Sequence, residues 1–207
     1  MRTRIKMCGM TRIEDIQCAA SLGVDAIGLV FYPPSPRAVS LEQASTLAKA
    51  CPVLVDKVAL FVNPEKSLVK EVIDATGATL LQFHGDETPE FCQQFGMPYL
   101  KALRVSDKHR LTTALKEHHE APAILLDAYV AGTPGGTGQQ FDWSLIPKGL
   151  MQRLFLAGGI NATNVADAIS SANPYAVDVS GGIESAKGIK SAQKMTDFVA
   201  AVREISS

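Results

Sequence analysis

The sequence has 207 residues, of which 46% are hydrophobic and 20% charged, which is ordinary for one globular domain. Lys and Arg number 20 against 21 Asp and Glu, so the net charge of −1 gives no electrostatic reason to expect a nucleic acid or a membrane as partner. No apolar run approaches the ~20 residues of a membrane span. We expect a single domain over residues 1–207.

The N-terminus and the cysteines both indicate the cytoplasm. Residues 1–6 lead directly into a strand pattern and lack the long apolar stretch of a signal peptide. The four cysteines, Cys8, Cys18, Cys51 and Cys92, show no Cys-x-x-Cys spacing, so neither a disulfide framework nor a zinc site is expected. We therefore expect a protein of the reducing cytosol that holds no metal.

Short apolar runs alternate with helix-period segments along the whole chain, which is typical of parallel β/α units. Eight runs are expected to form strands: Ile5–Met7, Ala26–Phe31, Lys57–Val62, Leu80–His84, Tyr99–Val105, Ala123–Asp127, Arg153–Ala157 and Ala176–Val179. Several are almost wholly apolar, as strands buried on both faces should be. Because about 26 residues suffice for a compact unit, we predict an α/β fold of the TIM-barrel type, (β/α)8, with eight parallel strands.

Side chains that can cap a helix precede several helical segments. Thr11–Glu14 and Ser40–Gln43 both fit the capping box, in which a hydroxyl is followed three residues later by Glu or Gln. Asn63 and Thr88 each precede a proline suited to the first helical position. Asn161 is placed to cap a further helix. These residues are expected to mark helix starts.

Two strands near the C-terminus run directly into small residues, Gly158-Gly159 and then Ser180-Gly181-Gly182. Paired glycines leave backbone N–H groups open to a ligand, so a phosphate can approach closely. A helix N-terminus behind such a turn favours the anion further. Because barrel phosphate sites are often built from the loops after strands seven and eight, we predict one phosphate site formed by both turns.

Cys8 and Asp127 are the candidate catalytic residues, since each stands at the end of a predicted strand. A helix N-terminus near Cys8 would favour a thiolate that acts as base or nucleophile; the alternative is a small buried core residue. Asp127 is either a general acid or base or an acceptor that caps its loop, and its position favours catalysis. On strands one and six, the two can face each other and exchange protons with a substrate, as an isomerisation requires.

Other polar residues carry weaker signals. Arg37, in a proline-rich loop, can pair with a substrate carboxylate or lie solvated at the surface. His84 can act in an acid–base cluster, but a role in orienting its loop is favoured. His109, His118 and His119 are expected on the solvated side of a helix.

One further loop is rich in glycine. Residues 128–140 lack the Lys-Ser/Thr of a P-loop, and no Gly-x-Gly-x-x-Gly opens a βαβ unit. A lid over the site is the preferred interpretation of this segment.

Seven motifs occur together in one order: Lys6–Thr11, Phe31–Arg37, Leu81–Gly85, Leu126-Asp127, Gly135–Trp143, Leu156–Ile160 and Asp178–Glu184. As a set they resemble the phosphoribosylanthranilate isomerase family of tryptophan biosynthesis, over essentially the whole chain. The length resembles the form without a fused indole-glycerol-phosphate synthase.

The resemblance implies an Amadori rearrangement of a small phosphosugar substrate, with no cofactor. Asp127 would protonate the ribose ring oxygen, and Cys8 would remove the proton from C2. Arg37 would hold the anthranilate carboxylate. The phosphate would be held by residues of the two glycine turns, namely Gly158, Gly159, Ser180, Gly181 and Gly182. Related barrels are monomers or homodimers, and the sequence leaves this choice open.

Two alternatives compete with this interpretation. The histidine-pathway aminoaldose isomerase performs similar chemistry on a related barrel, but uses an aspartate where this chain has Cys8. A non-catalytic phosphosugar-binding barrel would keep the glycines and lose proton transfer, which the presence of both Cys8 and Asp127 disfavours. A thiol redox protein is weaker still, since no second cysteine lies near Cys8 in sequence.

Overall fold

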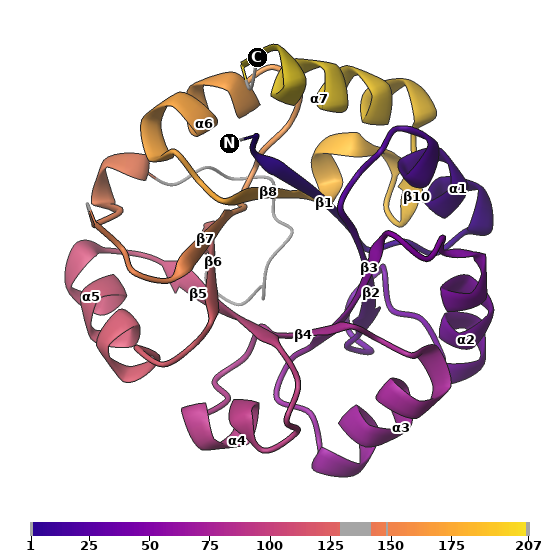
Figure 1. Ribbon diagram of the computed structural model, residues 1–207, viewed down its shortest axis with the longest axis horizontal. Coiled ribbons are helices and arrows are strands. Elements are labelled where there is room, and N and C mark those ends of the chain that lie inside the picture. The colour runs from indigo at the N-terminus through magenta and orange to yellow at the C-terminus, as the bar shows by residue number, and fades with distance from the viewer. Residues whose placement is uncertain (1, 129–141, 148, 206–207) are drawn as a thin grey trace.

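The computed structural model describes residues 2–128, 142–147 and 149–205. Eight parallel strands close into a barrel in chain order, surrounded by a ring of helices (Figure 1). The strands are β1 (Arg4–Cys8), β2 (Ala26–Phe31), β3 (Asp56–Phe61), β4 (Leu80–Phe83), β5 (Tyr99–Val105), β6 (Ala123–Ala128), β7 (Arg153–Leu156) and β8 (Ala176–Val179). The predicted TIM barrel is confirmed, with each strand within one residue of its expected ends.

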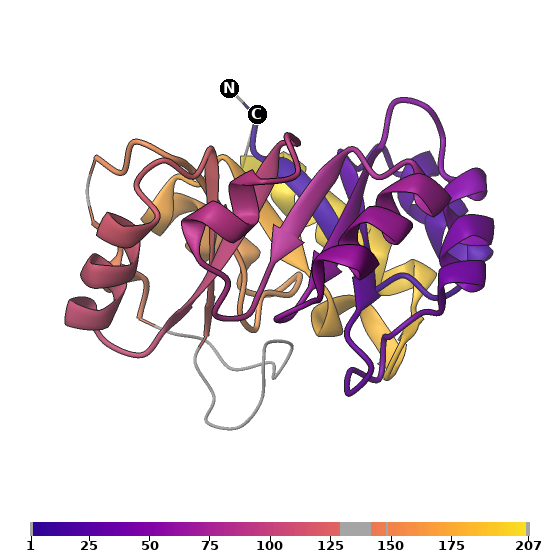
Figure 2. The ribbon, with the colours of Figure 1, turned by 90° about the horizontal axis from the view of Figure 1, so that it is seen from below.

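The helices cover the outside of the strands, and Figure 2 shows this layering from the side. They are α1 (Ile13–Ser21), α2 (Leu41–Ala50), α3 (Lys66–Thr76), α4 (Pro89–Gln93), α5 (Lys108–Glu117), α6 (Val165–Ala172) and α7 (Ala192–Ile205). Between β6 and β7 the described residues contain only a short 3-10 turn, η1 (Trp143–Leu145). None of the helices in the described ranges is long and apolar enough to cross a membrane. The lid prediction for residues 128–140 falls almost wholly outside the described residues.

After β8 the chain forms a 3-10 turn, η2 (Gly181–Ile183), and then a short hairpin of β9 (Glu184–Ala186) and β10 (Ile189–Lys190). The hairpin brings charged side chains from the C-terminal part of the chain to the end of β1. Arg12, which precedes α1, donates to the carbonyl of Lys190 at 3.0 Å. The hairpin is therefore fixed beside the first β/α unit.

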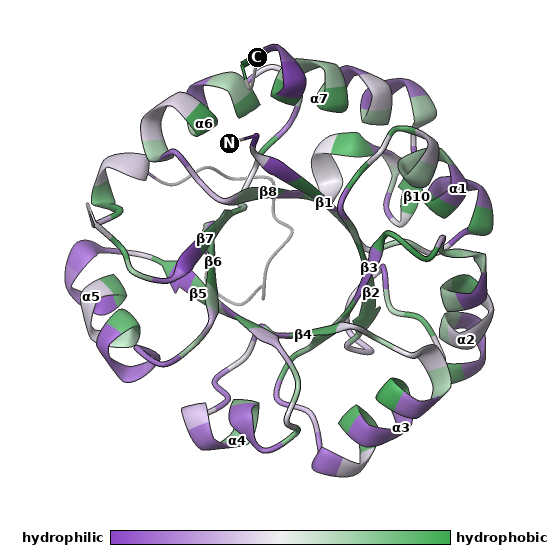
Figure 3. Cartoon of the chain, viewed as in Figure 1, coloured by the Kyte–Doolittle hydropathy of each residue, from purple (hydrophilic) through white to green (hydrophobic). Residues whose placement is uncertain are grey.

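Buried apolar residues form clusters on both sides of the barrel wall. Figure 3 marks the hydrophobic residues of the strands and helices in green. Outward-facing residues such as Phe61 and Phe83 pack under the helices, with ring centroids 6.1 Å apart. Inside, Leu100, Leu125 and Phe155 form a separate buried cluster. Successive residues of a strand point to opposite faces of the barrel wall. Polar residues two positions from a residue of the inner cluster therefore also point into the barrel.

Two of the predicted helix caps are confirmed and three are wrong. Ser40 forms the complete capping box of α2, and Thr88 caps α4 ahead of its proline. The hydroxyl of Thr11 instead donates to the Gly188 carbonyl, and α1 begins later, after Arg12.

The other two wrong caps lie in loops that continue past the expected helix start. Asn63 has a left-handed φ of 47° and accepts from the N–H of Asp86, while α3 begins only at Lys66. Asn161 accepts from Thr163 within a turn that precedes α6. In both places a tertiary or turn bond uses the side chain that the local pattern assigned to a cap.

Candidate active site

A cavity of about 380 Å³ opens at the carboxyl ends of the strands. This is the face on which barrel enzymes assemble their active sites. Its lining includes all the predicted site residues, which come from β1, β6 and the loops after β2, β7 and β8: Cys8, Arg37, Asp127, Gly158, Gly159, Ser180, Gly181 and Gly182. The structure therefore brings together residues that are up to about 170 positions apart in sequence.

Cys8 lies at the end of β1, with its side chain pointing inward and buried. Its register partner on β2 is Gly28, where an added Cβ would come within 2.7 Å of the sulfur. Burial raises the pKa of the Cys8 thiol, while the charges of Lys6 and Lys190 act in the opposite direction. The sequence pointed to a helix N-terminus as the group that favours the thiolate. In the structure α1 begins only at Ile13, and the two lysines supply the positive charge.

Directly below Cys8 lies a buried ion pair. Lys6 on β1 and Asp178 on β8 are register partners, and Lys6 Nζ lies 2.8 Å from Asp178 Oδ1. Burial opposes the charge on Lys6, but Asp178 and Cys8 outweigh it and leave the pKa of Lys6 above its usual value. Burial likewise raises the pKa of Asp178, against the effect of Lys6. The thiol thus sits above a cation that is already paired.

Asp127 occupies the end of β6 and is also buried. Its Oδ1 accepts from the N–H of Ala128 at 2.9 Å, and its Oδ2 lies 3.3 Å from His84 Nε2. The remaining side of the carboxyl group faces the cavity. The backbone N–H of Ala128 thus fixes Oδ1 of Asp127, and Oδ2 is the oxygen that can exchange a proton with a ligand.

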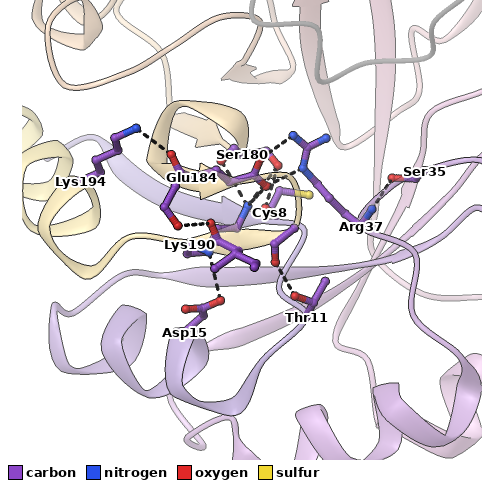
Figure 4. Close-up of polar contacts among 12 residues, drawn as sticks. Cys8, Thr11, Asp15, Ser35, Arg37, Ser180, Glu184, Lys190 and Lys194 are labelled. Carbon is purple, nitrogen blue, oxygen red and sulfur yellow. Dashed lines mark hydrogen bonds and ion pairs between the residues drawn. The ribbon is translucent and has the colours of Figure 1, made fainter.

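Arg37 is held by Glu184 from the hairpin after β8. Its Nε and Nη2 lie 2.7 Å and 2.8 Å from the two carboxylate oxygens, a bidentate pair (Figure 4). Burial opposes ionisation of Glu184, yet Arg37 and Lys190 hold the pKa of that carboxyl below its usual range. The alternative of a solvated surface arginine is wrong, because the Arg37 side chain is only 12% exposed. Within the described residues its other terminal nitrogen, Nη1, has no hydrogen-bond partner.

Lys190 connects the same network to the glycine turns. Its Nζ lies 2.9 Å from Glu184 Oε1 and 3.2 Å from the carbonyl of Ser180, while the Ser180 hydroxyl donates to the carbonyl of Cys8 at 2.9 Å (Figure 4). Hydrogen bonds therefore connect the hairpin, the β8 turn and the end of β1 to one another.

The two glycine turns need glycine for steric reasons. Gly158 and Gly159 have φ of 82° and 67°, the left-handed region that side chains disfavour. At Gly182 an added Cβ would come within 2.1 Å of the Ile160 carbonyl, so the β7 and β8 turns touch without room for a methyl group. The prediction that both turns form one surface is confirmed; that this surface binds phosphate stays a prediction.

Sequence reasoning missed part of the site. Gln82, on β4, lines the cavity and was not a candidate. His84, directly after β4, also lines the cavity; it was a candidate for an acid–base cluster with a role in orienting its loop favoured, and its hydrogen bond with Gln82 was not predicted. The signal was present in their period-2 spacing, which puts both on the inner face of the strand. The prediction that His118 is solvated is wrong: it ends α5 and is buried, and burial lowers the pKa of its imidazole.

The fold and the site define a barrel enzyme of the acid–base class, in which a thiol and a carboxyl group share one cavity with a guanidinium and two glycine turns. Residues 5–201 match the family model described as N-(5'-phosphoribosyl)anthranilate (PRA) isomerase. The chain belongs to this family.

Individual relatives agree. The enzyme N-(5'-phosphoribosyl)anthranilate isomerase of Azotobacter vinelandii is 54% identical over 200 residues, which cover 97% of each chain. A crystal structure of phosphoribosyl anthranilate isomerase from Thermotoga maritima superposes with a TM-score of 0.91 at 35% identity, covering 98% of this chain and 99% of that one. A further such structure, in complex with reduced 1-(o-carboxyphenylamino)-1-deoxyribulose 5-phosphate, has a TM-score of 0.88 at 35% identity and covers 98% and 99%.

Proposed function

We propose that Cys8 and Asp127 carry the two proton transfers by which this chain isomerises N-(5'-phosphoribosyl)anthranilate. The activity itself, a step of tryptophan biosynthesis, follows from membership of the family. The observation that supports these roles is the placement of both groups on one cavity, at the ends of β1 and β6. The comparisons give no support to the histidine-pathway enzyme or to a non-catalytic barrel.

In the first step Asp127 donates a proton to the ring oxygen of the ribose. The bond between that oxygen and C1 breaks, and the lone pair of the anthranilate nitrogen forms an iminium with C1. Because Oδ1 accepts from the backbone of Ala128, the proton would be carried on Oδ2. A buried carboxyl group that lines the cavity is suited to this general-acid role.

In the second step the Cys8 thiolate removes the proton from C2. The electrons of the C–H bond form a C1–C2 double bond and neutralise the iminium, which gives an enolamine that becomes the ketone. The iminium makes this proton acidic, so proton transfer by side chains is sufficient. Lys6 beside Cys8 stabilises the thiolate that burial alone would disfavour.

Substrate binding is assigned to the ends of the cavity. Arg37 would pair with the anthranilate carboxylate through Nη1, since Glu184 occupies its other edge. Gly158, Gly159 and the Ser180–Gly182 turn would hold the phosphate. Because Lys190 ties the β8 turn to Glu184, the two anionic ends of the substrate would be fixed relative to each other.

The test is the loss of substrate fluorescence with pure protein. Cys8→Ser and Asp127→Asn should each reduce kcat by at least about a hundredfold, the scale of acid–base residues. Cys18→Ser and Asp197→Asn are matched controls, because both residues lie on outer helices and do not line the cavity. A near-normal kcat in either of the first two variants removes that residue from the mechanism, and a loss of activity with a chelator would contradict metal-free catalysis.

The cellular setting and the assembly are proposed on weaker support. Family membership in a biosynthetic pathway supports a cytoplasmic enzyme. Monomer or homodimer remains the prediction; one related structure from Thermotoga maritima is described as monomers generated from a dimeric enzyme. Sedimentation of the pure chain decides between the two.

A further inference from the structure

We propose that His84 is a positioning residue for Asp127, and that Gln82 holds His84 in the tautomer this role requires. The proposal rests on the proposed function, since it gives His84 a part in the general-acid step. It assigns to β4 a contribution to catalysis that complements the groups on β1 and β6.

The polar atoms of β4 form a chain that ends at the acid. Gln82 Nε2 lies 3.1 Å from His84 Nδ1, and His84 Nε2 lies 3.3 Å from Asp127 Oδ2. In the orientation that the Gln82 amide has in the structure, its nitrogen donates and His84 Nδ1 accepts. The neutral imidazole then carries its proton on Nε2, where it faces Asp127.

Without substrate, this arrangement leaves His84 Nε2 buried and without a hydrogen-bond partner among the described residues. Gln82 is fully buried and His84 is 7% exposed. At 3.3 Å the His84 Nε2–H has the distance but not the alignment of a hydrogen bond, and it has no other partner among the described residues. A buried donor without a good partner destabilises a fold, so its presence indicates a function.

The reaction supplies the missing partner. When Asp127 gives its proton to the ring oxygen, a carboxylate forms on the atom that His84 Nε2–H faces. Catalytic hydrogen bonds are often long without substrate and tighten as charge develops. A donor that is already aimed at a developing charge lowers the barrier most where the two groups are shielded from water, and both His84 and Asp127 are buried. The backbone N–H of Ala128 serves Oδ1 in the same way.

Four variants test this assignment. His84→Leu removes the donor and should lower kcat about thirty- to a hundredfold with KM changed less than about threefold, because the contact strengthens only in the transition state. His84→Gln keeps a donor at a similar reach and should recover at least about tenfold of that loss. Gln82→Met should lower kcat by about fivefold and mix the two imidazole tautomers in ¹⁵N NMR spectra. His118→Leu is the matched control, since it also removes a buried imidazole with an unpartnered nitrogen but lies away from the cavity.

Combination with Asp127→Asn separates positioning from a structural role. If His84 acts through Asp127, adding His84→Leu to Asp127→Asn should lower kcat little further. If His84→Leu instead damages the structure, the double variant should lose the kcat factors of both single variants. Equal losses in His84→Leu and His84→Gln, or a His84→Leu kcat within threefold of the parent, overturn the inference. In that case an inactive Asp127→Asn leaves the proposed function intact, whereas an active one overturns the proposed function itself.

Discussion

Two buried lysines on opposite sides of the barrel wall form similar ion pairs that have different roles. Lys6 points inward from β1 and pairs with Asp178 at 2.8 Å; Lys101 points outward from β5 and pairs with Glu87 at 2.7 Å. Both side chains are nearly wholly shielded from solvent. The inner pair lies under the Cys8 thiol, while neither residue of the outer pair lines the cavity.

The partner carboxylates explain the difference. Glu87 also accepts from the N–H groups of Asn63 and Gly85, so the outer pair ties together the loops after β3 and β4. Asp178 lines the cavity and shares Lys6 with Cys8. The outer pair therefore organises backbone, and the inner pair places charge beside Cys8, the base of the proposed mechanism. Variants on each side can break or sharpen this distinction.

The largest effect is expected for Lys6→Met. The substitution leaves Asp178 as a buried carboxylate without its partner, which typically lowers the free energy of unfolding by about 3 kcal/mol or more. It also removes the cation that stabilises the thiolate, so kcat should fall by about a hundredfold. Denaturant unfolding and kinetics at a temperature where the variant is folded measure the two effects. A stable variant with normal kcat would show that the inner pair is merely structural.

Lys101→Met should affect stability alone. Breaking the pair with Glu87 should lower the free energy of unfolding by about 3–5 kcal/mol, because the carboxylate stays buried. The folded variant should keep kcat/KM within about twofold of the parent, since no cavity residue loses a contact. Circular dichroism melts and the fluorescence assay measure both quantities. A large kcat loss with an intact fold would contradict the separation between the two sides.

The sequence predicts the barrel well and its charge pairs poorly, for a physical reason. Strands buried on both faces, such as Ala26–Phe31, appear as continuous apolar runs, so their position is a local property. Cys8, Asp127 and Gly158 were expected to lie at one site because strand ends share one face of a barrel, and they line one cavity. Lys6 and Asp178 are 172 positions apart, and their pairing depends on the closure of β8 against β1.

The same limit applies to side chains that have more than one use. Arg37 was expected to serve a ligand, and the structure gives it Glu184, 147 positions away, as a fixed partner. Thr11 and Asn63 have the residue types of caps, but tertiary contacts take their hydrogen bonds. Local pattern gives the available donors and acceptors, whereas the closed barrel decides how they are paired.

A smaller effect is expected on the inner side at the glycine turns. Gly182→Ala places a methyl group against the Ile160 carbonyl and must displace one turn, so KM should rise by about tenfold. At Gly181 the added Cβ meets only Arg37 Nη2 at 3.5 Å, an ordinary contact, so Gly181→Ala should raise KM much less. Steady-state kinetics of the pair provide the measurement. Equal KM values in the two variants would show that contact between the turns does not shape the binding site.

The smallest effect is expected for Cys92, a buried cysteine on the helical layer outside the barrel. Cys92 on α4 is buried without a cation strong enough to offset burial, which raises its pKa to about 12. An unfolded thiol ionises near pH 8.5, so above that pH the unfolded chain releases a proton that the folded chain retains. This contribution to stability is complete below about pH 8.5 and is lost progressively as the pH rises toward 12.

Between pH 8 and pH 10 the parent should therefore lose about 2 kcal/mol more unfolding free energy than Cys92→Ala, measured by denaturant titration. Cys51→Ala is the matched control, since Cys51 is only half-buried at the end of α2 and should show a smaller difference. Parallel pH profiles for the parent and Cys92→Ala would contradict the raised pKa. A steeper profile in the parent would mean that burial holds Cys92, outside the barrel, as a thiol, in contrast to Cys8, where the nearby charge of Lys6 acts against the effect of burial.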